Sequence, residues 1–389
     1  MKTMKSKFYS LALAAGMLTL TACSDDNTND SNNDKGNGIE NGSILKGTIT
    51  EDVTLKAGNT YKLSGEYIVE AGATLNIEEG VKIISVYDNI VDYILVKQGA
   101  KINAVGTPDK PIVMTSEKEE PGAWGGIHIC GKAHTNAEGG KGSSEIGGAV
   151  YGGNDDADNS GTLQYIRLEY TGFAFDEEHE ANGISFYGVG NGTIVDHCEA
   201  YKGSDDGFEF FGGSVNVSNM VVVSCSDDSF DWTEGWNGKG TNLVAYQEAE
   251  STLGYDCDCL MECDNNGSNN AATPVAHPVL KNLILVGNGG SKQGIRLRAG
   301  TEVEIDNAKV CGKGQPLTVE TALTENALKN GTSKLTNITL TSELSSKEGI
   351  YTHADFIAVT SNKVDANLSY SSFEDIRKEC SWMNGSWVK

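Results

Sequence analysis

The feature that most constrains the fold is a short motif that recurs every 22 to 24 residues. In each copy, Asn or Asp is followed by Gly or Ser and then by two large apolar residues that flank one polar residue, at residues 182–186, 206–210 and 228–232. A glycine-rich corner and a second apolar strand follow each copy, and a fourth copy, which begins with Gln, lies at residues 293–297. A repeat of this length cannot bury its own apolar face, so neighbouring repeats must stack. The pattern predicts an all-β chain folded as a right-handed parallel β-helix.

Alternation along these strands separates core residues from surface residues. The residues predicted to point inward are Ile184, Phe186, Phe208, Phe210, Phe230, Trp232, Ile295 and Leu297. The residues predicted to point outward are Ser185, Glu209, Asp231 and Arg296. Inward residues of successive coils should stack about 4.8 Å apart, and we expect Phe186, Phe208 and Phe230 to lie in one column. Residues 44–60 and the aromatic C-terminus are the expected covers for the two ends of the solenoid.

The N-terminus predicts export and lipidation. Three lysines precede an apolar run at residues 11–20, which is too short for a transmembrane helix of about 20 residues and is typical of a signal peptide. The run ends in residues 20–23, Leu-Thr-Ala-Cys, which resemble the lipobox of bacterial lipoproteins and imply a lipid on Cys23. The acidic residues after Cys23 resemble the surface-export signal of Bacteroidota-type lipoproteins. We expect a signal peptide at 1–22, a disordered tether at 23–43 and a β-helix domain at 44–389, anchored to the outer face of the outer membrane.

Net charge limits the kinds of ligand that the chain can bind. The formal charge is −24, and it becomes −27 when residues 1–22, which carry three lysines and no acidic residue, are removed. Such a chain has no basic stripe with which to bind nucleic acid or anionic lipid, whereas calcium, cationic ligands and neutral glycans remain possible ligands.

Eight cysteines follow Cys23. Among them we expect a local disulfide within the group Cys257, Cys259 and Cys263, with a zinc site as the weaker alternative.

Several motifs resemble one family. They are Trp-Gly-Gly-Ile at 124–127, Tyr-Gly-Gly-Asn-Asp-Asp at 151–156, Asp-Asp-Gly-Phe-Glu-Phe-Phe-Gly-Gly at 205–213 and the aromatic ending at 381–387. Together they resemble a family of β-helix-repeat surface lipoproteins that is common in Bacteroidota, and the likeness runs from about residue 45 to the C-terminus. The resemblance implies the β-helix fold and a location at the cell surface, and it implies no particular chemistry.

The strongest chemical feature is a pair of acidic corners at residues 204–207 and 226–229. If they occupy equivalent places on adjacent coils, the carboxylates of Asp205, Asp206, Asp227 and Asp228 form one patch. At about 5 Å and an effective dielectric constant near 20, each close pair repels by roughly 3 kcal/mol. Calcium, hydrogen bonds from corner amides, raised pKa values or divergence of the side chains could offset that repulsion. The plain structural alternative is that corner Asp and Asn residues cap backbone amides.

Extracellular β-helices that cleave pectins offer two comparisons. In polygalacturonases paired aspartates act as acid and base, and Asp205 and Asp206 resemble that pair, but the glycine-flanked histidine of those enzymes is missing because none of the six histidines lies between two glycines. Pectate lyases hold calcium on aspartates and use an arginine as the base. On that comparison, the metal ligands would be Asp227, Asp228 and Asp231, and the base would be Arg296 or Arg298.

Two further groups of residues could bind ligands. The oxygen side chains of Asp156, Asp158 and Ser160, followed by a glycine, have the spacing of a calcium loop, although Arg167 stands where an EF-hand has its bidentate glutamate. A solvated turn is the alternative there. The aromatic residues in glycine-rich corners, where a ring could project outward and stack on a sugar beside Glu209 and Asp231, are Trp124, Trp236, Tyr151 and Tyr187. Packing into the core would explain these four residues equally well.

Taken together, these patterns favour a lipid-anchored binding or scaffold protein whose lateral face meets a glycan or a partner protein of the outer membrane. The alternative is a calcium-dependent polysaccharide lyase or glycoside hydrolase that uses the corner aspartates. The two hypotheses differ in what stands beside the acids, because catalysis needs a suitably placed proton donor or acceptor.

Overall fold

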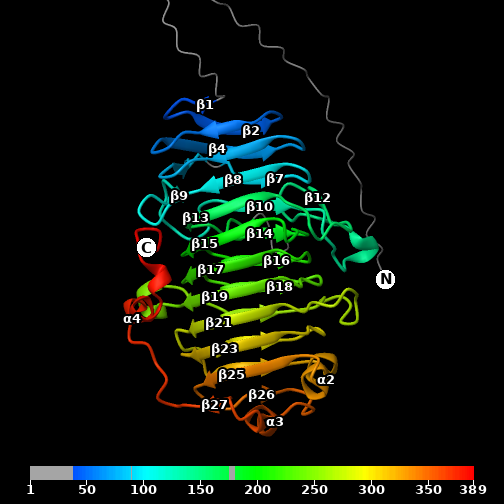
Figure 1. Ribbon diagram of the computed structural model, residues 1–389. Helices are drawn as coiled ribbons and strands as arrows, with labels where there is room; N and C mark the ends of the chain where they lie inside the picture. Colours follow the sequence, from blue (N-terminus) through cyan, green and yellow to red (C-terminus); the bar gives the residue numbers. More distant parts are fainter. Residues whose placement is uncertain (1–37, 89, 175–179) are drawn as a thin grey trace, which may run out of the picture. The chain divides into compact units, whose positions relative to one another are not determined.

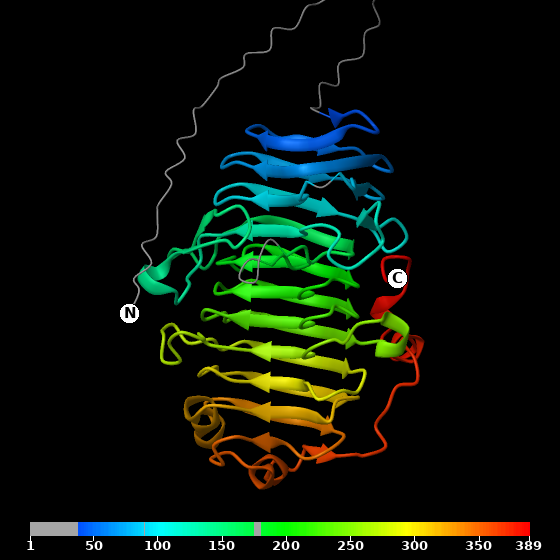
Figure 2. The same cartoon turned by 180° about the vertical axis from the view of Figure 1, so that it is seen from behind.

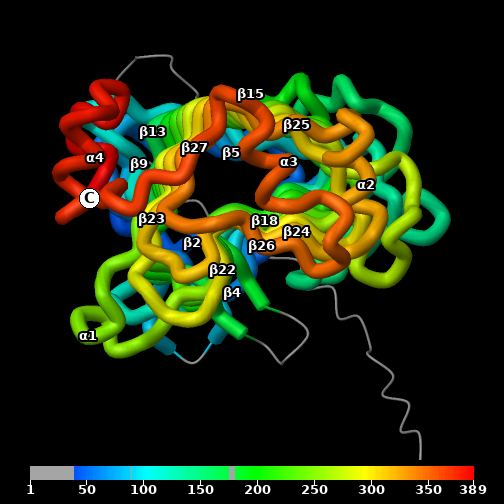
Figure 3. The backbone as a smooth tube through the Cα atoms, turned by 90° about the horizontal axis from the view of Figure 1, so that it is seen from below, coloured from blue at the N-terminus to red at the C-terminus, as the bar shows by residue number. Residues whose placement is uncertain are grey.

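A computed structural model describes residues 38–88, 90–174 and 180–389. These residues form a parallel β-helix in which 25 strands join one continuous sheet (Figures 1 and 2). The predicted fold class is therefore confirmed. Successive coils superimpose when the structure is seen along the axis of the solenoid (Figure 3). No helix among the described residues is both long enough and apolar enough to span a membrane.

The elements of the first coils are β1 (Gly38–Ile39), β2 (Ile44–Ile49), β3 (Val53–Leu55), β4 (Thr60–Val69), β5 (Thr74–Ile77), β6 (Lys82–Ser85), β7 (Tyr93–Val96), β8 (Lys101–Val105), β9 (Ile112–Ser116) and β10 (Ile127–Cys130). An insertion after β10 carries the 3₁₀ turn η1 (Glu138–Gly140) and the hairpin of β11 (Gly142–Ser143) and β12 (Val150–Tyr151). β1 begins at Gly38, so the solenoid starts before the predicted boundary at residue 44.

Short and long strands then alternate along the chain. The short strands are β14 (Ile184–Tyr187), β16 (Phe208–Phe211), β18 (Phe230–Thr233), β20 (Met261–Cys263), β22 (Gln293–Leu297), β24 (Gln315–Val319) and β26 (Ser345–Ser346). The long series is β13 (Gly161–Glu169), β15 (Ile194–Tyr201), β17 (Asn216–Val223), β19 (Lys239–Tyr246), β21 (Val279–Val286), β23 (Glu304–Cys311) and β25 (Lys334–Leu340), and it ends in the short β27 (Lys363–Val364). The helices are α1 (Glu250–Leu253), α2 (Ala322–Asn330), α3 (His353–Ala358) and α4 (Phe373–Glu379), with a last 3₁₀ turn η2 (Ser381–Met383).

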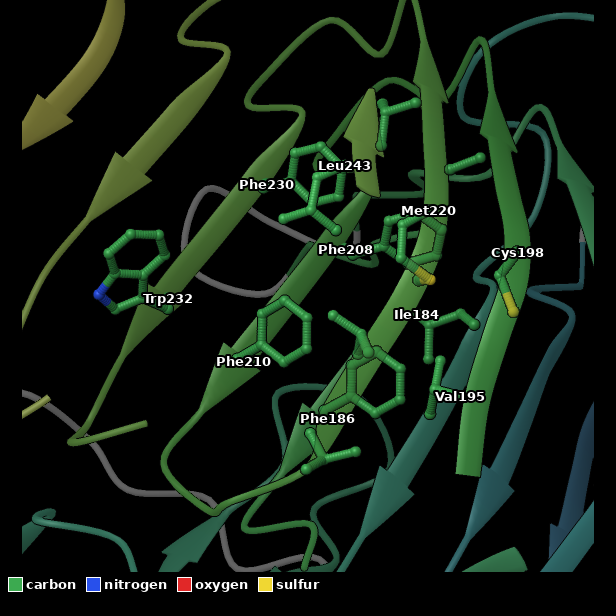
Figure 4. Packing of buried hydrophobic residues seen from close by; sticks show 14 of the residues in the cluster. Ile184, Phe186, Val195, Cys198, Phe208, Phe210, Met220, Phe230, Trp232 and Leu243 are labelled. Atoms are coloured by element: carbon green, nitrogen blue, oxygen red, sulfur yellow. The ribbon is translucent and has the colours of Figure 1, made fainter. Parts of the chain in front are cut away.

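The core consists of apolar columns that run from coil to coil, as the repeat spacing predicted. Ile184 pairs with Phe208, and Phe208 pairs with Phe230, in parallel register. The rings of Phe208 and Phe230 stack with centroids 6.0 Å apart (Figure 4). The prediction of one column for Phe186, Phe208 and Phe230 is wrong in one member. Phe186 is two residues along its strand from Ile184, so it pairs with Phe210 in the neighbouring column, where the ring centroids are 5.1 Å apart.

The long strands bend at a residue in the left-handed conformation. Asn219, Asn242, Asn282 and Asn307 occupy this bend on four successive coils with φ between 55 and 62°. Asparagine tolerates this conformation, and here its side-chain amide also satisfies the next coil. The Nδ2 of Asn242 donates to Oδ1 of Asn219 at 2.8 Å, and Nδ2 of Asn282 donates to Oδ1 of Asn242 at 3.0 Å. The ladder fixes the register on which the position of every outward side chain depends.

The ends of the solenoid differ from expectation. Phe356 of α3 is fully buried in the main core cluster, so α3 covers the C-terminal end. The aromatic C-terminus, predicted to be this cover, instead runs back along the side of the solenoid (Figure 1). It packs beside β13 and β15, where Trp387 is fully buried and contacts the ring of His197. The last coil is closed by α3 and its neighbouring turns, and Leu328 of α2 belongs to the same core cluster.

The expected local disulfide is absent from the described residues. All eight cysteines that follow Cys23 are buried free thiols, and Cys257, Cys259 and Cys263 do not bridge one another. Cys263 lies in β20 and pairs with Trp232 and Leu297 of the core column, whereas Cys257 and Cys259 lie in the corner that precedes β20.

We predict that Phe210→Ala lowers the free energy of unfolding by about 3–5 kcal/mol, because Phe210 is 2% exposed and stacks on both Phe186 and Trp236. Ile194→Ala is the matched control at a residue that is 51% exposed, and it should change stability by no more than about 0.5 kcal/mol. Urea denaturation followed by circular dichroism gives both values. Equal midpoints for the two variants would contradict the column packing.

Candidate functional site

An acidic cleft lies at the corners that lead into the short strands. Its volume is about 430 Å³, and its lining residues are Glu145, Glu180, Asn182, Asp205, Asp206, Glu209, Asp227, Asp228, Asp231, Asp258, Glu262 and Arg296. Ten of these twelve residues carry a carboxylate, one carries an amide and one a guanidinium. The structure thus brings together Asp205, Asp206, Asp227 and Asp228, which the sequence placed on adjacent coils. The term acidic cleft is used below for this set of residues.

The parallel register of the short strands builds one wall of the acidic cleft. Glu209 of β16 pairs with Asp231 of β18, and Asp231 pairs with Glu262 of β20. Glu262 in turn pairs with Arg296 of β22. These side chains alternate with the core residues of the same strands, so they point away from the core. Three acidic residues and one arginine therefore form a column along the outer face.

A second column of acids lies at the corners, where Asp206 and Asp228 stand two residues before β16 and β18. Oδ1 of Asp206 accepts the backbone N–H of Asp228 at 2.9 Å, and Oδ1 of Asp228 accepts the backbone N–H of Cys259 at 2.6 Å. Each aspartate therefore caps the corner of the following coil. These bonds use one oxygen of each carboxylate and leave the other for further contacts in the acidic cleft.

Burial and mutual repulsion disfavour the ionised form of these acids. Desolvation, followed by the charges of Glu180 and Asp227, raises the pKa of Asp205 to about 8. Desolvation and the charge of Asp258 raise the pKa of Asp227 to about 6. The same causes, with burial the largest, hold the pKa values of four further acids well above their usual range: Asp206, Glu209, Asp228 and Asp231. The acidic cleft must therefore hold protons, or cations must neutralise it.

Three triplets of carboxylates have the spacing for a shared cation. In each, one oxygen per residue lies within 4.8 Å of the others, and the triplets are Asp206 with Glu209 and Asp231, Asp206 with Asp227 and Asp228, and Glu180 with Asp205 and Asp227. Calcium takes six to eight oxygen ligands from carboxylates, amide carbonyls and water, so each triplet suits calcium as part of such a shell. A fourth triplet, Asp228 with Cys259 and Glu262, includes a thiol and a carboxylate that already binds arginine.

An unpaired amide oxygen points to the same ligand class. Asn182 is 1% exposed and lines the acidic cleft, and its Nδ2 donates to Glu209 Oε2 at 2.6 Å and to Ser185 Oγ at 3.1 Å. Its Oδ1 is buried without a hydrogen-bond partner, as is Oδ1 of Asp231. A buried oxygen without a donor is unfavourable by about 1–3 kcal/mol unless something occupies it. A cation beside Asp206, Glu209 and Asp231 would give Asn182 that partner.

Arg296, which lines the acidic cleft, and its neighbour Arg298 both form ion pairs with acidic side chains. Arg296 binds Glu262 at 2.8 Å and Glu320 at 3.3 Å, and Arg298 binds Asp264 at 2.7 Å and also pairs with Glu262. Although burial alone would lower it, the hydrogen bonds that Arg296 donates to Glu320 and Glu262, together with their charges, raise the pKa of Arg296 above its usual value. A base must first be unprotonated, so this arrangement opposes the role of proton acceptor that was considered for Arg296 or Arg298.

The side chains of the predicted calcium loop, Asp156, Asp158 and Ser160, do not converge on a common point where a cation could bind. Oδ1 of Asp156 contacts Nδ1 of His134 at 2.6 Å and accepts the backbone N–H of His134 at 3.1 Å. Oδ2 of Asp158 accepts the backbone N–H of Lys132 at 3.0 Å, and Ser160 is 2% exposed. Among the residues that the structure describes, none of the acidic groups with metal-like spacing includes these side chains. Asp156 and Asp158 instead cap the backbone amides of His134 and Lys132, and the burial of Ser160 also departs from the solvated turn that was the alternative.

The four corner aromatic residues are buried, so of the two interpretations left open by the sequence the structure agrees with packing into the core. Trp124 and Trp236 are each 1% exposed, Tyr151 is 3% exposed and Tyr187 is fully buried. Trp124 donates to the carbonyl of Glu169 at 2.8 Å, and the Trp236 ring stacks on Phe210 with centroids 4.2 Å apart. Glycine corners leave room for a large ring to turn inward as well as outward, and here the rings fill the core.

Sequence reasoning missed four acidic residues and the key amide. Asp258 and Glu262 continue the columns of Asp227 and Asp231, but the insertion that contains α1 lengthens the spacing there and hides the repeat. Glu145 comes from the β11–β12 insertion, and Glu180 precedes the first motif, so neither carries a repeat signal. Asn182 is the first residue of the motif and could have been found, because it stands where Asp206 and Asp228 stand in later copies.

We predict that calcium at about 100 times its Kd stabilises the protein by about 2.7 kcal/mol per occupied site, because the folded state alone assembles the ligands. Asp231→Asn should lose most of this gain, and its Tm in EDTA should be no lower than that of the unmodified protein, because the change removes one of the mutually repelling acids. Glu119→Gln, at an exposed acid outside the acidic cleft, is the control with the same change of charge. Differential scanning calorimetry with and without calcium measures the effect, and an equal gain in both variants would place the cation elsewhere.

Comparison with known proteins identifies the family of the chain. The family model of the pectate-lyase-like β-helix domain matches residues 47–388, which is nearly the whole solenoid. Searches of the curated proteins and of the solved structures found no match. The match agrees with the parallel coils and the stacked core described above. The chain belongs to the pectate-lyase-like β-helix domain family.

Proposed function

We propose that the protein is a lipid-anchored surface protein that binds a carboxylate-bearing glycan through calcium ions held in the acidic cleft. The observation that carries this proposal is the combination, in one cleft, of ten carboxylates with the unpaired oxygen of Asn182. Membership in the pectate-lyase-like family fits a carbohydrate-related β-helical protein. The cleft lies on the lateral face of the solenoid, where an extended chain can run across several coils.

Calcium explains how an acidic cleft can hold an acidic sugar. Without a cation, a uronate carboxylate would be repelled by Asp205, Asp206 and their neighbours. A calcium ion bound by a triplet such as Asp206, Glu209 and Asp231 keeps open coordination positions, because the triplet supplies fewer than the six to eight oxygens that calcium takes. A uronate carboxylate and its hydroxyl groups can fill those positions. The ion thus bridges two groups of like charge.

Binding is favoured over base catalysis because the cationic side chains near the acidic cleft are held in their protonated form by ion pairs. Arg296 and Arg298 hold ion pairs with Glu262, Glu320 and Asp264, and Lys292 pairs with Asp258. Each is therefore held in its charged form. Among the described residues that line the acidic cleft, Arg296 is the one basic side chain.

A glycoside hydrolase is the second candidate, and one observation favours it. The pKa of Asp205 is raised to about 8, so this carboxyl group keeps its proton at neutral pH, as a general acid must. Nearby carboxyl groups with lower pKa values, such as Asp227 at about 6, would then serve as the base. Product analysis separates this candidate from simple binding.

We predict calcium-dependent binding of an oligogalacturonate and little binding of the matched neutral oligosaccharide. Glu209→Gln should weaken binding by about tenfold or more, which corresponds to about 1.4 kcal/mol. The glutamine keeps an acceptor for Asn182 and removes one calcium ligand, while Glu119→Gln again serves as control. Isothermal titration calorimetry in calcium and in EDTA provides the affinities. Undiminished binding in EDTA would refute the calcium bridge, unsaturated products would indicate a lyase, and new saturated reducing ends would indicate a hydrolase.

The anchor is tested separately. We predict that Cys23→Ala moves the protein from the membrane fraction to the soluble fraction, because the lipid on Cys23 would be its attachment. Fractionation and intact mass of the unmodified protein check the lipid, and proteinase treatment of whole cells checks exposure at the surface. A membrane-bound Cys23→Ala protein would overturn the lipidation proposal without affecting the acidic cleft.

A further inference from the structure

The chain ends in a strap, defined here as residues 365–389, that returns from β27 along the side of the solenoid (Figures 1 and 3). Its helix α4 and turn η2 pack on a second buried cluster that includes Val221, Val244 and Ile284 on the outer side of the long strands. Most residues between 363 and 371 are exposed or only partly buried, so the strap is joined to the last coil by a lightly packed connection. The strap is therefore held by α4, by η2 and by the residues that follow them.

The last residues of the strap dock on coils that lie much earlier in the chain. We call this docking surface, formed by Pro108, Arg167, Glu169 and Glu199, the seat. Trp387 is fully buried and Val388 is 4% exposed. The backbone N–H of Ser386 donates to the carbonyl of Pro108 at 2.8 Å, and Nη1 of Arg167 donates to the carbonyl of Ser386 at 2.8 Å. These bonds join the C-terminus to coils that precede it by more than two hundred residues.

The final residue adds a cation site to this seat. The Nζ of Lys389 lies 3.0 Å from Oε2 of Glu169, and it stands over the ring of Tyr201 at 4.5 Å and over that of Tyr170 at 5.0 Å. The backbone N–H of Lys389 donates to Oε2 of Glu199 at 2.9 Å. An ammonium group between two rings and a carboxylate is a favourable arrangement, although its strength falls where water has access.

Glu199 is the residue of the seat whose hydrogen bonding is incomplete. Its side chain is fully buried beneath Lys389, and its Oε1 has no hydrogen-bond partner. The charged groups that face it are Arg167 and Glu169 of β13 and Lys389 of the strap, whereas β17 presents the apolar Val221. A buried carboxylate with an unpaired oxygen is strongly disfavoured when ionised and much less so when protonated.

We infer that the strap is detachable and that the proton on Glu199 governs it: the strap stays seated while the Glu199 carboxyl group is protonated and loosens when that group ionises. Lifting the strap would let water reach Glu199 and would free the rings of Tyr170 and Tyr201 from Lys389. The device is independent of calcium and of the glycan proposed above.

The direction of the pH dependence follows from the burial of Glu199. Desolvation raises the pKa of Glu199 to about 8 in the seated state, against a usual value near 4.3 for glutamate in water. The seated state therefore holds the proton more tightly, so seating is favoured at low pH and weakens as pH rises from about 4.3 to about 8. Glu169 acts oppositely: despite desolvation, Lys389 and Arg167 lower its pKa, so its contribution is lost only as the pH falls below the usual glutamate range.

Hydrogen–deuterium exchange of the C-terminal peptide, residues 381–389, in the mature protein tests this inference. After correction for the intrinsic pH dependence of exchange, protection should fall by up to about 100-fold between about pH 6 and about pH 9. Glu199→Gln, which stays neutral and keeps an acceptor for Lys389, should remain protected at both values. Glu169→Gln should lose protection at both, because it removes the partner of the Lys389 ammonium group.

Two outcomes would overturn the inference. One is equal protection of the unmodified protein at both pH values, which would mean that Glu199 does not control seating. The other is an equal loss of protection in the unmodified protein and in Glu199→Gln, which would assign the effect to another group. Peptides from the core columns, such as the one that contains Phe210, serve as internal references because they should not change.

Discussion

The parallel register between coils is the constraint on which the structure depends. The register that stacks Phe208 on Phe230 inside the solenoid also sets Glu209 beside Asp231 on the outside, because side chains alternate along each strand. Apolar columns gain from this repetition, since each ring finds the next at stacking distance. Acidic columns lose from it, since like charges repeat every coil. The acidic cleft is therefore a consequence of the same geometry that makes the core.

The sequence predicted those features that the repeat spacing encodes. The spacing of 22 to 24 residues translates directly into register, so the fold and the meeting of Asp206 with Asp228 could both be predicted. Residues in or after insertions could not be predicted from the repeat spacing. The insertion around α1 displaced Glu262 from the expected spacing, and the β11–β12 hairpin supplied Glu145. The direction of a side chain at a glycine corner was equally hidden, because Trp236 can turn inward onto Phe210 only in the presence of that neighbour.

The chemistry of the acidic cleft rests on an imbalance between its acids and its cations. Each corner aspartate accepts one backbone N–H of the next coil, which stabilises that corner. Burial, and then the charges of neighbouring acids, hold the pKa values of Asp206 and Asp228 well above their usual range. Arg296 compensates Glu262 and Glu320 at one end, while Asn182 and Asp231 keep unpaired oxygens toward the other. The cation that we propose at that second end would satisfy the amide and the carboxylates together.

Anomalous diffraction from a crystal of the protein soaked with calcium, or with a lanthanide in its place, tests this account most directly. The account predicts an anomalous peak within coordination distance of Asp206, Glu209 and Asp231 and of Oδ1 of Asn182. An acidic cleft without a peak, in which the same carboxyl groups are paired through shared protons, would contradict it.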